Sequence, residues 1–320
     1  MILSTPHGES YLPTVNAFRS SQNLCSIGGE KLALGTVQFG LNYGVANTQG
    51  QISYDQAESM VRAMSRAGVD TIDTAIAYGE AETVLGRIGV SGFRLVSKVP
   101  ALCEPGRAVD DWVVAQVEAS LERLRVPRLG GLMLHAPDDL LGQHGSELAR
   151  GLQRARDEGL AERIGLSVYN PEQLATFIDR LPLEIIQIPF NVFDRRFVET
   201  GWLDRLLADD VEVHARSIFL QGLLLMPPEV LPAKFSPFRS LIDDWHTWLA
   251  GEEAAGRSAV EACLAHVASY EGIARLVVGA DSLHQLMDII EAVSIAPMRA
   301  PDSLASHATP LINPAQWNTL

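Results

Sequence analysis

The sequence predicts an α/β fold, a closed (β/α)8 TIM barrel, from three observations. Short β-rich segments alternate eight times with helical segments after Lys31. The chain has 320 residues, of which 47% are hydrophobic, and this is enough for one large core. No Gly-x-Gly-x-x-Gly follows the first expected strand and no Gly-x-x-x-x-Gly-Lys-Ser/Thr occurs, so the usual nucleotide loops of open sheets are missing. An open doubly wound sheet is the alternative.

The expected strands and helices run in strict alternation along the chain. The strands are expected at 32–36, 69–74, 93–98, 130–135, 163–167, 185–190, 211–216 and 275–279. The helices are expected at 53–67, 80–88, 109–125, 145–158, 171–180, 196–208, 257–270 and 282–293. Three helix starts carry a pair of residues typical of a cap: Ser53 with Gln56, Asn170 with Gln173, and Ser282 with Gln285.

The two ends of the chain lie outside this alternation. Residues 1–30 are rich in Ser, Gly, Asn and Pro without a sustained period, which indicates a lead-in or a small hairpin. Residues 31–320 are expected to form a single barrel whose tail, from about 294, covers the active-site face. No low-complexity linker marks a second domain.

Charge and cysteine usage favour a small-molecule partner in the cytoplasm. The 25 Lys and Arg residues against 39 Asp and Glu residues give a net charge of −14, which disfavours nucleic acid and anionic membranes as partners. No segment is typical of a signal peptide or a membrane span. Cys25, Cys103 and Cys263 fit no metal or redox spacing and are interpreted as structural. Nothing in the sequence indicates the oligomeric state.

Four titratable residues fall at or just after the ends of expected strands: Asp73, Tyr78, Lys98 and His135. In parallel barrels the carboxyl ends of the strands carry the active site. A neighbouring ammonium would lower the pKa of a phenol toward the range useful for proton transfer, a carboxylate would hold that ammonium, and an imidazole could hydrogen-bond a substrate oxygen. Each residue alone also fits a structural role: a loop cap, a packed ring, a solvated strand end or a core imidazole.

Together these residues resemble the aldo-keto reductase superfamily. The likeness covers roughly residues 31–293 and includes no metal-ligand cluster. It is carried by Gly35-Thr36-Val37-Gln38-Phe39-Gly40, Asp73-Thr74-Ala75, Tyr78-Gly79-x-x-Glu82-x-x-Leu85-Gly86, Lys98 and His135. The resemblance implies a (β/α)8 barrel that binds NADPH in extended form and reduces an aldehyde or ketone without a metal. It implies Tyr78 as general acid, Asp73 and Lys98 as the pair that tunes it, and His135 as the group that orients the carbonyl.

The resemblance also implies a set of residues around the nicotinamide. Gly35 and Thr36 belong to the cofactor-binding stretch after the first strand, while Ser167 and Gln187 match residues that hold the nicotinamide amide. Val168 stands where many members of the family have Asn, which removes one amide contact.

The stretch from Arg216 to Leu224 resembles the loop that covers the cofactor pyrophosphate, with Ser217, Leu220 and Gly222 as binding positions. Arg216 stands where the family commonly has an aromatic ring stacked on the nicotinamide, and a planar guanidinium can also stack on a flat ring. A structural Arg paired with a barrel carboxylate is the alternative.

The adenosine end of the expected cofactor site departs from the family pattern. Gly279, Ser282 and Gln285 match binding positions, but the usual Lys and Arg are absent and Asp281 adds a negative charge. The helix start at Ser282 offers backbone amides to an anion. We therefore expect weak discrimination between NADPH and NADH, less than about tenfold.

The substrate and two other functions stay open at this point. Pocket walls are expected from Phe39, Asn42 and Tyr43, the loop after His135, the insertion at about 223–256 with Trp245 and Trp248, and the tail with Trp317 as a lid residue. A small carbonyl compound is the expected substrate. The alternatives are a cofactor-sensing regulatory subunit and a Schiff-base lyase that uses Lys98.

Overall fold

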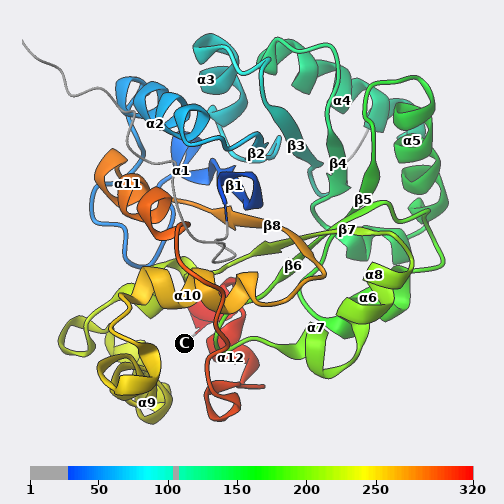
Figure 1. The fold of residues 1–320 in the computed structure, drawn as a ribbon. Coiled ribbons are helices and arrows are strands. Elements are labelled where there is room, and N and C mark those ends of the chain that lie inside the picture. The colour runs from blue at the N-terminus through cyan, green and yellow to red at the C-terminus, as the bar shows by residue number, and fades with distance from the viewer. Residues whose placement is uncertain (1–27, 104–107, 320) are drawn as a thin grey trace, which may run out of the picture.

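The computed structural model describes residues 28–103 and 108–319, in which eight parallel strands close into a barrel (Figure 1). Each strand pairs with the next, and β8 pairs with β1, so the sheet has no free edge. The strands are β1 (Leu32–Gly35), β2 (Thr71–Asp73), β3 (Arg94–Val99), β4 (Gly131–Leu134), β5 (Ile164–Ser167), β6 (Ile185–Pro189), β7 (Glu212–Arg216) and β8 (Ile273–Val278). The predicted TIM barrel is confirmed.

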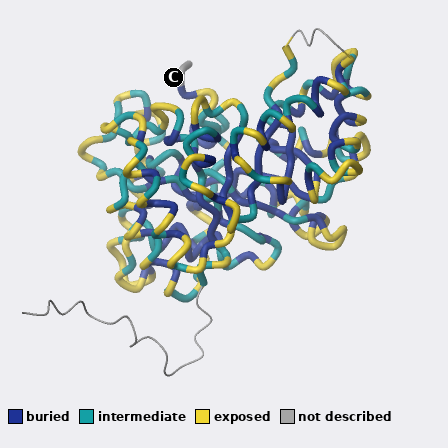
Figure 2. Tube along the Cα trace, turned by 90° about the horizontal axis from the view of Figure 1, so that it is seen from above, coloured by how far each residue is buried: buried dark blue, intermediate teal, exposed yellow. Residues whose placement is uncertain are grey.

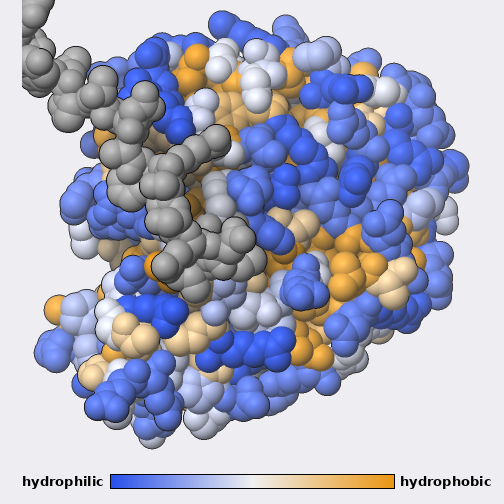
Figure 3. Space-filling model, in the orientation of Figure 1, coloured by the Kyte–Doolittle hydropathy of each residue, from blue (hydrophilic) through white to orange (hydrophobic). Residues whose placement is uncertain are grey.

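Helices surround the strands, and buried residues concentrate inside this ring (Figures 1 and 2). Polar residues cover most of the face drawn in Figure 3. The α-helices are α1 (Val37–Gly40), α2 (Tyr54–Arg66), α3 (Ala81–Ile88), α4 (Val109–Leu124), α5 (Gly145–Asp157), α6 (Pro171–Phe177), α7 (Arg196–Glu199), α8 (Trp202–Ala208), α9 (Arg239–Ala250), α10 (Ala259–Ala268), α11 (Leu283–Ala292) and α12 (Thr309–Ile312).

The bounds of the eight expected strands and of seven of the eight expected helices agree with the observed ones to within three residues. The helix expected at 196–208 is two helices, because Gly201 adopts a left-handed conformation with φ 75° between α7 and α8. Strand β8 begins at Ile273, two residues before the expected start. The expected insertion at 223–256 contains α9.

The three predicted caps are confirmed, since the side chains of Ser53, Asn170 and Ser282 accept hydrogen bonds from the backbone N–H of the third residue of each helix. Most of residues 1–30, including Cys25, lies outside the described part of the chain.

The strand register brings the predicted site residues to one end of the barrel. Gly35 pairs with Asp73, Ser167 with Gln187, and Pro189 with Arg216. Because all strands are parallel, these pairs mark a common carboxyl end. The register alone therefore gathers residues that are far apart in the sequence.

A buried carboxylate fastens the outer face of the barrel to two helices. Glu82 on α3 is 2% exposed and accepts hydrogen bonds from Ser97 Oγ on β3 at 2.7 Å and from Ser120 Oγ on α4 at 2.6 Å. Arg123 on α4 donates to its other oxygen through Nε at 2.9 Å and a terminal nitrogen at 2.7 Å. Gly86 lies one turn further along α3, where a Cβ would approach the Arg123 carbonyl oxygen to 1.9 Å. The close contact of the two helices thus depends on a small residue and a satisfied charge.

Replacing Glu82 with Ala should destabilise the fold by about 3 kcal/mol, because two buried hydroxyls and a guanidinium lose their acceptor. We expect the midpoint of thermal unfolding to fall by about 4–5 °C. Glu80→Ala is the matched control, since Glu80 is exposed and its side chain caps nothing. Equal melting temperatures for the two variants would show that the network contributes little to stability.

Candidate active site

A cavity of about 790 Å³ opens at the carboxyl ends of the strands. Its lining includes nine of the predicted cofactor residues and three of the four predicted catalytic residues, all but Lys98. Leu220 and Ser282 do not line it. The lining residues come from the ends of β1, β2 and β5 to β8, from the residue after β4, and from the segments after β1, β2, β5, β7 and β8. The structure therefore joins most of the predicted positions in one cavity.

Asp73 and Lys98 form a buried ion pair beneath this cavity. The Lys98 Nζ to Asp73 Oδ1 distance is 2.7 Å, and the two side chains are 0% and 4% exposed. Lys98 also donates to the Thr74 carbonyl oxygen at 3.0 Å, and Gln187 Nε2 donates to Asp73 Oδ2 at 2.7 Å. Burial lowers the pKa of Lys98, while the Asp73 carboxylate opposes that shift. The pair links β2, β3 and β6 at their carboxyl ends.

Tyr78 lies on the loop after β2 and lines the cavity. Two glycines allow this loop to lie against the loop after β1: a Cβ on Gly40 would be 1.8 Å from the Tyr78 carbonyl oxygen, and Gly79 has φ 54°. Among the described residues, no side chain or backbone group hydrogen-bonds the Tyr78 hydroxyl. The hydroxyl is therefore available to a molecule in the cavity.

His135 follows β4 and meets the ring of Tyr78 edge to face, with ring centroids 5.7 Å apart. Burial lowers the pKa of His135 to about 4, and the nearby cations Lys98 and Arg216 contribute to the shift. The imidazole is therefore neutral near pH 7. A neutral imidazole can still donate one hydrogen bond into the cavity.

The structure does not support the expected lowering of the Tyr78 pKa by Lys98. Lys98 Nζ lies 5.4 Å from the centroid of the Tyr78 ring. Burial raises the pKa of Tyr78 well above its ordinary value, Asp73 raises it further, and Arg216 is the group that lowers it. The sequence could not show this, because the depth of the ring and the distance to Arg216 depend on tertiary structure.

Arg216 at the end of β7 has no carboxylate partner among the described residues, so the structural alternative proposed for it is wrong. It donates to the Val168 carbonyl oxygen at 3.0 Å and to Ser217 Oγ at 3.2 Å. Its guanidinium carbon lies 4.5 Å from the centroid of the Tyr169 ring. No pattern in the sequence singles out Tyr169, which also lines the cavity.

The polar groups near Asp73 fit the carboxamide of a nicotinamide. Gln187 Nε2 donates a hydrogen bond to Asp73, and this leaves Gln187 Oε1 as an acceptor. The Ser167 hydroxyl has no hydrogen-bond partner among the described residues. Thr36 is held by its own hydrogen bond to the Asp73 carbonyl oxygen, at 3.0 Å. Gly35 and Thr36 both line this part of the cavity. One donor and one acceptor are thus presented together, as a carboxamide requires.

The loop after β7 has an unusual backbone. Ser217, Leu220 and Gln221 have φ of 60°, 48° and 53°, and Gly222 has φ 89°. Successive backbone N–H groups in such conformations form concave anion-binding sites, which suits a pyrophosphate. Gln221 Nε2 donates to the Tyr43 hydroxyl at 2.8 Å, and this bond joins the loops after β1 and β7.

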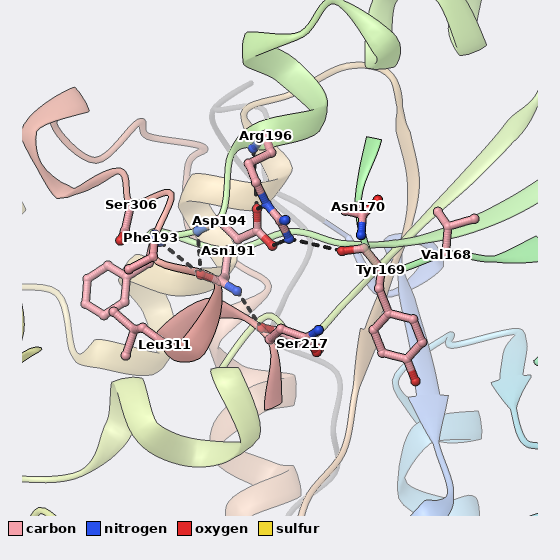
Figure 4. Close-up of polar contacts among 12 residues, drawn as sticks. Val168, Tyr169, Asn170, Asn191, Phe193, Asp194, Arg196, Ser217, Ser306 and Leu311 are labelled. Carbon is pink, nitrogen blue, oxygen red and sulfur yellow. Dashed lines mark hydrogen bonds and ion pairs between the residues drawn. The ribbon is translucent and has the colours of Figure 1, made fainter. Parts of the chain in front are cut away.

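A hydrogen-bond network fixes the loops after β5, β6 and β7 relative to one another (Figure 4). Asn191 accepts from the backbone N–H groups of Phe193 and Asp194 and donates to the Ser217 carbonyl oxygen. Asp194 binds Arg196, which also donates to the Tyr169 carbonyl oxygen at 3.0 Å. Asp194 is fully buried, so its charge depends on this pairing.

The adenosine end of the expected site is formed by the loop after β8. Gly279, Asp281 and Gln285 line the cavity, while Ser282 caps α11 instead. Gln285 Oε1 accepts from the Asp281 backbone N–H at 2.8 Å. Gln38 Nε2 donates to Asp281 Oδ1 at 3.3 Å.

Several expected wall residues are packed elsewhere. Phe39 is 1% exposed, and neither it nor Asn42 lines the cavity, whereas Tyr43 does. Trp245 and Trp248 stack on each other at 5.4 Å away from the cavity lining. No described residue from 294 onward lines the cavity, and Trp317 packs against Phe235 at 4.8 Å, so it is not a lid residue. Of the insertion, Leu225, Met226, Pro227 and Val230 line the cavity.

Two features are absent from residues 28–103 and 108–319. No group of three or more His, Cys, Asp or Glu side chains there could hold a metal ion. No helix there has the length and apolar content needed to cross a membrane.

Comparison with known proteins identifies relatives of this chain. The aldo-keto reductase YhdN of Bacillus subtilis (strain 168) is 30% identical over 155 residues, covering 44% of this chain and 45% of that protein. Curated relatives such as this one are matched over less than half of their length. A probable voltage-gated potassium channel subunit beta of Oryza sativa subsp. japonica is 25% identical over 295 residues, covering 82% of this chain and 89% of that protein.

Solved structures share the fold. The holo form of aldo-keto reductase AKR11C1 from Bacillus halodurans has a TM-score of 0.70 at 20% identity and covers 89% of this chain and 95% of that one. An aldo/keto reductase from Klebsiella pneumoniae in complex with NADP and acetate has a TM-score of 0.60 at 21% identity, covering 83% and 86%.

The sequence profile of the Aldo/keto reductase family matches residues 31–302, which is most of the chain. This protein belongs to the Aldo/keto reductase family.

Proposed function

We propose that this protein is an oxidoreductase that reduces an aldehyde or ketone to an alcohol with NADPH or NADH. The observation that carries the proposal is the buried Asp73–Lys98 ion pair at a cavity that Asp73, Tyr78 and His135 line. Family membership supports the reaction class, and a family relative has been solved with NADP. The proposed substrate is a small carbonyl compound.

When bound, the reduced nicotinamide supplies a hydride to the carbonyl carbon. Tyr78 donates its hydroxyl proton to the carbonyl oxygen as negative charge develops there, and His135 orients that oxygen by a hydrogen bond. Lys98 and Asp73 hold the strand ends beneath the ring, and Arg216 lowers the pKa of the phenol and favours negative charge on the substrate oxygen. Ser167 and Gln187 hold the nicotinamide carboxamide.

The regulatory alternative has one specific observation in its favour. This chain matches the probable potassium channel subunit beta over 89% of that protein's length, but YhdN over only 45% of its length. A cofactor-sensing subunit with little turnover would need the same cofactor cavity. The lyase alternative fits the structure poorly, because Lys98 is fully buried, bound to Asp73, and does not line the cavity.

The protein should bind a reduced nicotinamide dinucleotide without a metal. Titration with NADPH or NADH, followed by cofactor fluorescence in the presence of a chelator, should give saturable binding, because the cavity offers amide, hydroxyl and backbone donors. Absence of binding by both dinucleotides, or activity that a chelator removes and a metal restores, would contradict the proposal.

Tyr78→Phe should lower turnover by about 10² or more while cofactor affinity stays near native, because only the proton donor is removed. Lys98→Met should also lower turnover, and the two changes should combine less than additively, since Lys98 acts by holding the strand end that positions Tyr78. Tyr54→Phe, on α2, is the matched control. Near-native turnover of Tyr78→Phe with a substrate that the native protein reduces would reject the catalytic assignment and favour the regulatory alternative.

Carbonyl reduction should be nearly independent of pH between about pH 5 and 9, because His135 stays neutral above its lowered pKa and Tyr78 stays protonated below its raised one. Alcohol oxidation should instead accelerate as pH rises, since Tyr78 must then accept a proton. Steady-state kcat in both directions measures this. An acid limb near pH 6.5 that disappears in His135→Gln would show that the imidazole titrates normally.

A further inference from the structure

The cavity ends at the loop after β8 in Asp281, whose carboxylate and backbone N–H each form one hydrogen bond. Asp281 Oδ1 accepts a hydrogen bond from Gln38 Nε2, which comes from α1 after β1, at 3.3 Å. The backbone N–H of Asp281 donates to Gln285 Oε1 at 2.8 Å, and the next residue, Ser282, caps α11. Asp281 lines the cavity together with Gln38 and Gln285. Its carboxylate is therefore a fixed part of the wall.

No cation balances this carboxylate within the described part of the chain. Asp281 forms no ion pair with a described Lys or Arg residue. Arg216 is the single Lys or Arg among the described lining residues, and it is engaged beside Tyr169 and Val168. His284 on α11 is 88% exposed in its side chain and faces Asp288 at 3.9 Å. A phosphate at this end of the cavity would thus meet a negative charge and no guanidinium or ammonium.

Gln38 adds an acceptor of its own. It is 8% exposed, lines the cavity, and its Oε1 is buried without a hydrogen-bond partner among the described residues. Gly279 leaves room for this side chain, because a Cβ there would lie 2.9 Å from Gln38 Nε2. A buried acceptor without a donor is unfavourable, and a ligand hydroxyl would satisfy it.

We propose that Asp281 and Gln38 accept hydrogen bonds from the hydroxyls of an unphosphorylated adenosine ribose, so that the cavity selects NADH over NADPH. This inference rests on the proposed function. A carboxylate that accepts from the ribose 2′-hydroxyl is a general device for binding NAD, whereas the 2′-phosphate of NADP calls for an Arg. The weak discrimination expected from the sequence becomes a definite preference, because the structure holds the carboxylate at the wall and brings it no cation.

Binding titrations with NADH and NADPH test the assignment on the full chain. We expect NADH to bind at least about tenfold more tightly than NADPH to the native protein. Asp281→Asn keeps the size of the side chain and an acceptor for Gln38 but removes the charge, so the preference should shrink, chiefly through tighter NADPH binding. Asp281→Arg should reverse the preference.

Asp288→Asn is the matched control, because it removes one negative charge from α11 at a side chain that is 53% exposed and does not line the cavity. It should leave the ratio of the two affinities unchanged. A ratio that changes equally in Asp281→Asn and Asp288→Asn would reflect the overall charge and would overturn the role of Asp281.

Calorimetric titration with ADP and 2′,5′-ADP isolates the adenosine end without the nicotinamide. ADP should bind more tightly than 2′,5′-ADP. NADPH binding as tight as NADH, with 2′,5′-ADP at least equal to ADP, would overturn this inference and leave the reductase proposal standing. Failure of all four nucleotides to bind would overturn both.

Discussion

The buried ion pair between Asp73 and Lys98 is the constraint on which the rest of the site depends. Two charges with almost no exposure are tolerable only when they are paired and their remaining hydrogen-bonding positions are filled. The Thr74 carbonyl oxygen and the Gln187 amide fill positions on either side of the pair. Because these partners come from β2, β3 and β6, the pair fixes three strand ends at once. The loop that carries Tyr78 begins at one of them.

The inside of the barrel is layered, with charge at both ends and a thin apolar layer between. Side chains alternate along a strand, so Glu212, His214 and Arg216 of β7 share the inner face. Glu212 binds Arg94, Arg163 and His214 at the opposite end from Arg216. Between the ends, Val96, Met133 and Ile185 form an apolar cluster separate from the main core. Charges that stabilise the closed barrel are thereby kept apart from the charges at the cavity.

The sequence was sufficient for the fold and for most of the cavity, because both depend on local signals and on register. Hydrophobic periodicity and cap residues located the eight strands and their helices, and parallel pairing then brought Asp73, Tyr78 and His135 to one end. Helix α9 was not predicted, because the segment around it has the pattern of an insertion between barrel units. The interruption at Gly201 was not predicted either, because a single left-handed residue hardly changes the hydrophobic periodicity.

What the sequence could not supply were contacts between distant loops. The Arg216 guanidinium lies over the ring of Tyr169 on the loop after β5, and Gln38 donates to Asp281 after β8, so neither partner can be predicted from the neighbouring residues in the chain. The direction of the pKa shift of Tyr78 was missed for the same reason, since it depends on burial. These contacts alter the role expected for each side chain in the site, but they leave the predicted fold unchanged.

The cavity as a whole carries opposite charges toward its two ends, and this polarity bears on how it would hold its ligands. Arg216 brings positive charge near Tyr78, where negative charge develops on a substrate oxygen in the proposed reaction, while Asp281 brings negative charge to the end proposed for the adenosine. Between them the backbone at Ser217 to Gly222 offers donors to a pyrophosphate, and the bond between Tyr43 and Gln221 ties together the two loops beside it. An extended dinucleotide placed in the reverse direction would bring its nicotinamide to Asp281 instead of to Gln187 and Ser167, whose free amide oxygen and hydroxyl fit a carboxamide. The polar groups of the wall therefore favour a single orientation of the proposed cofactor.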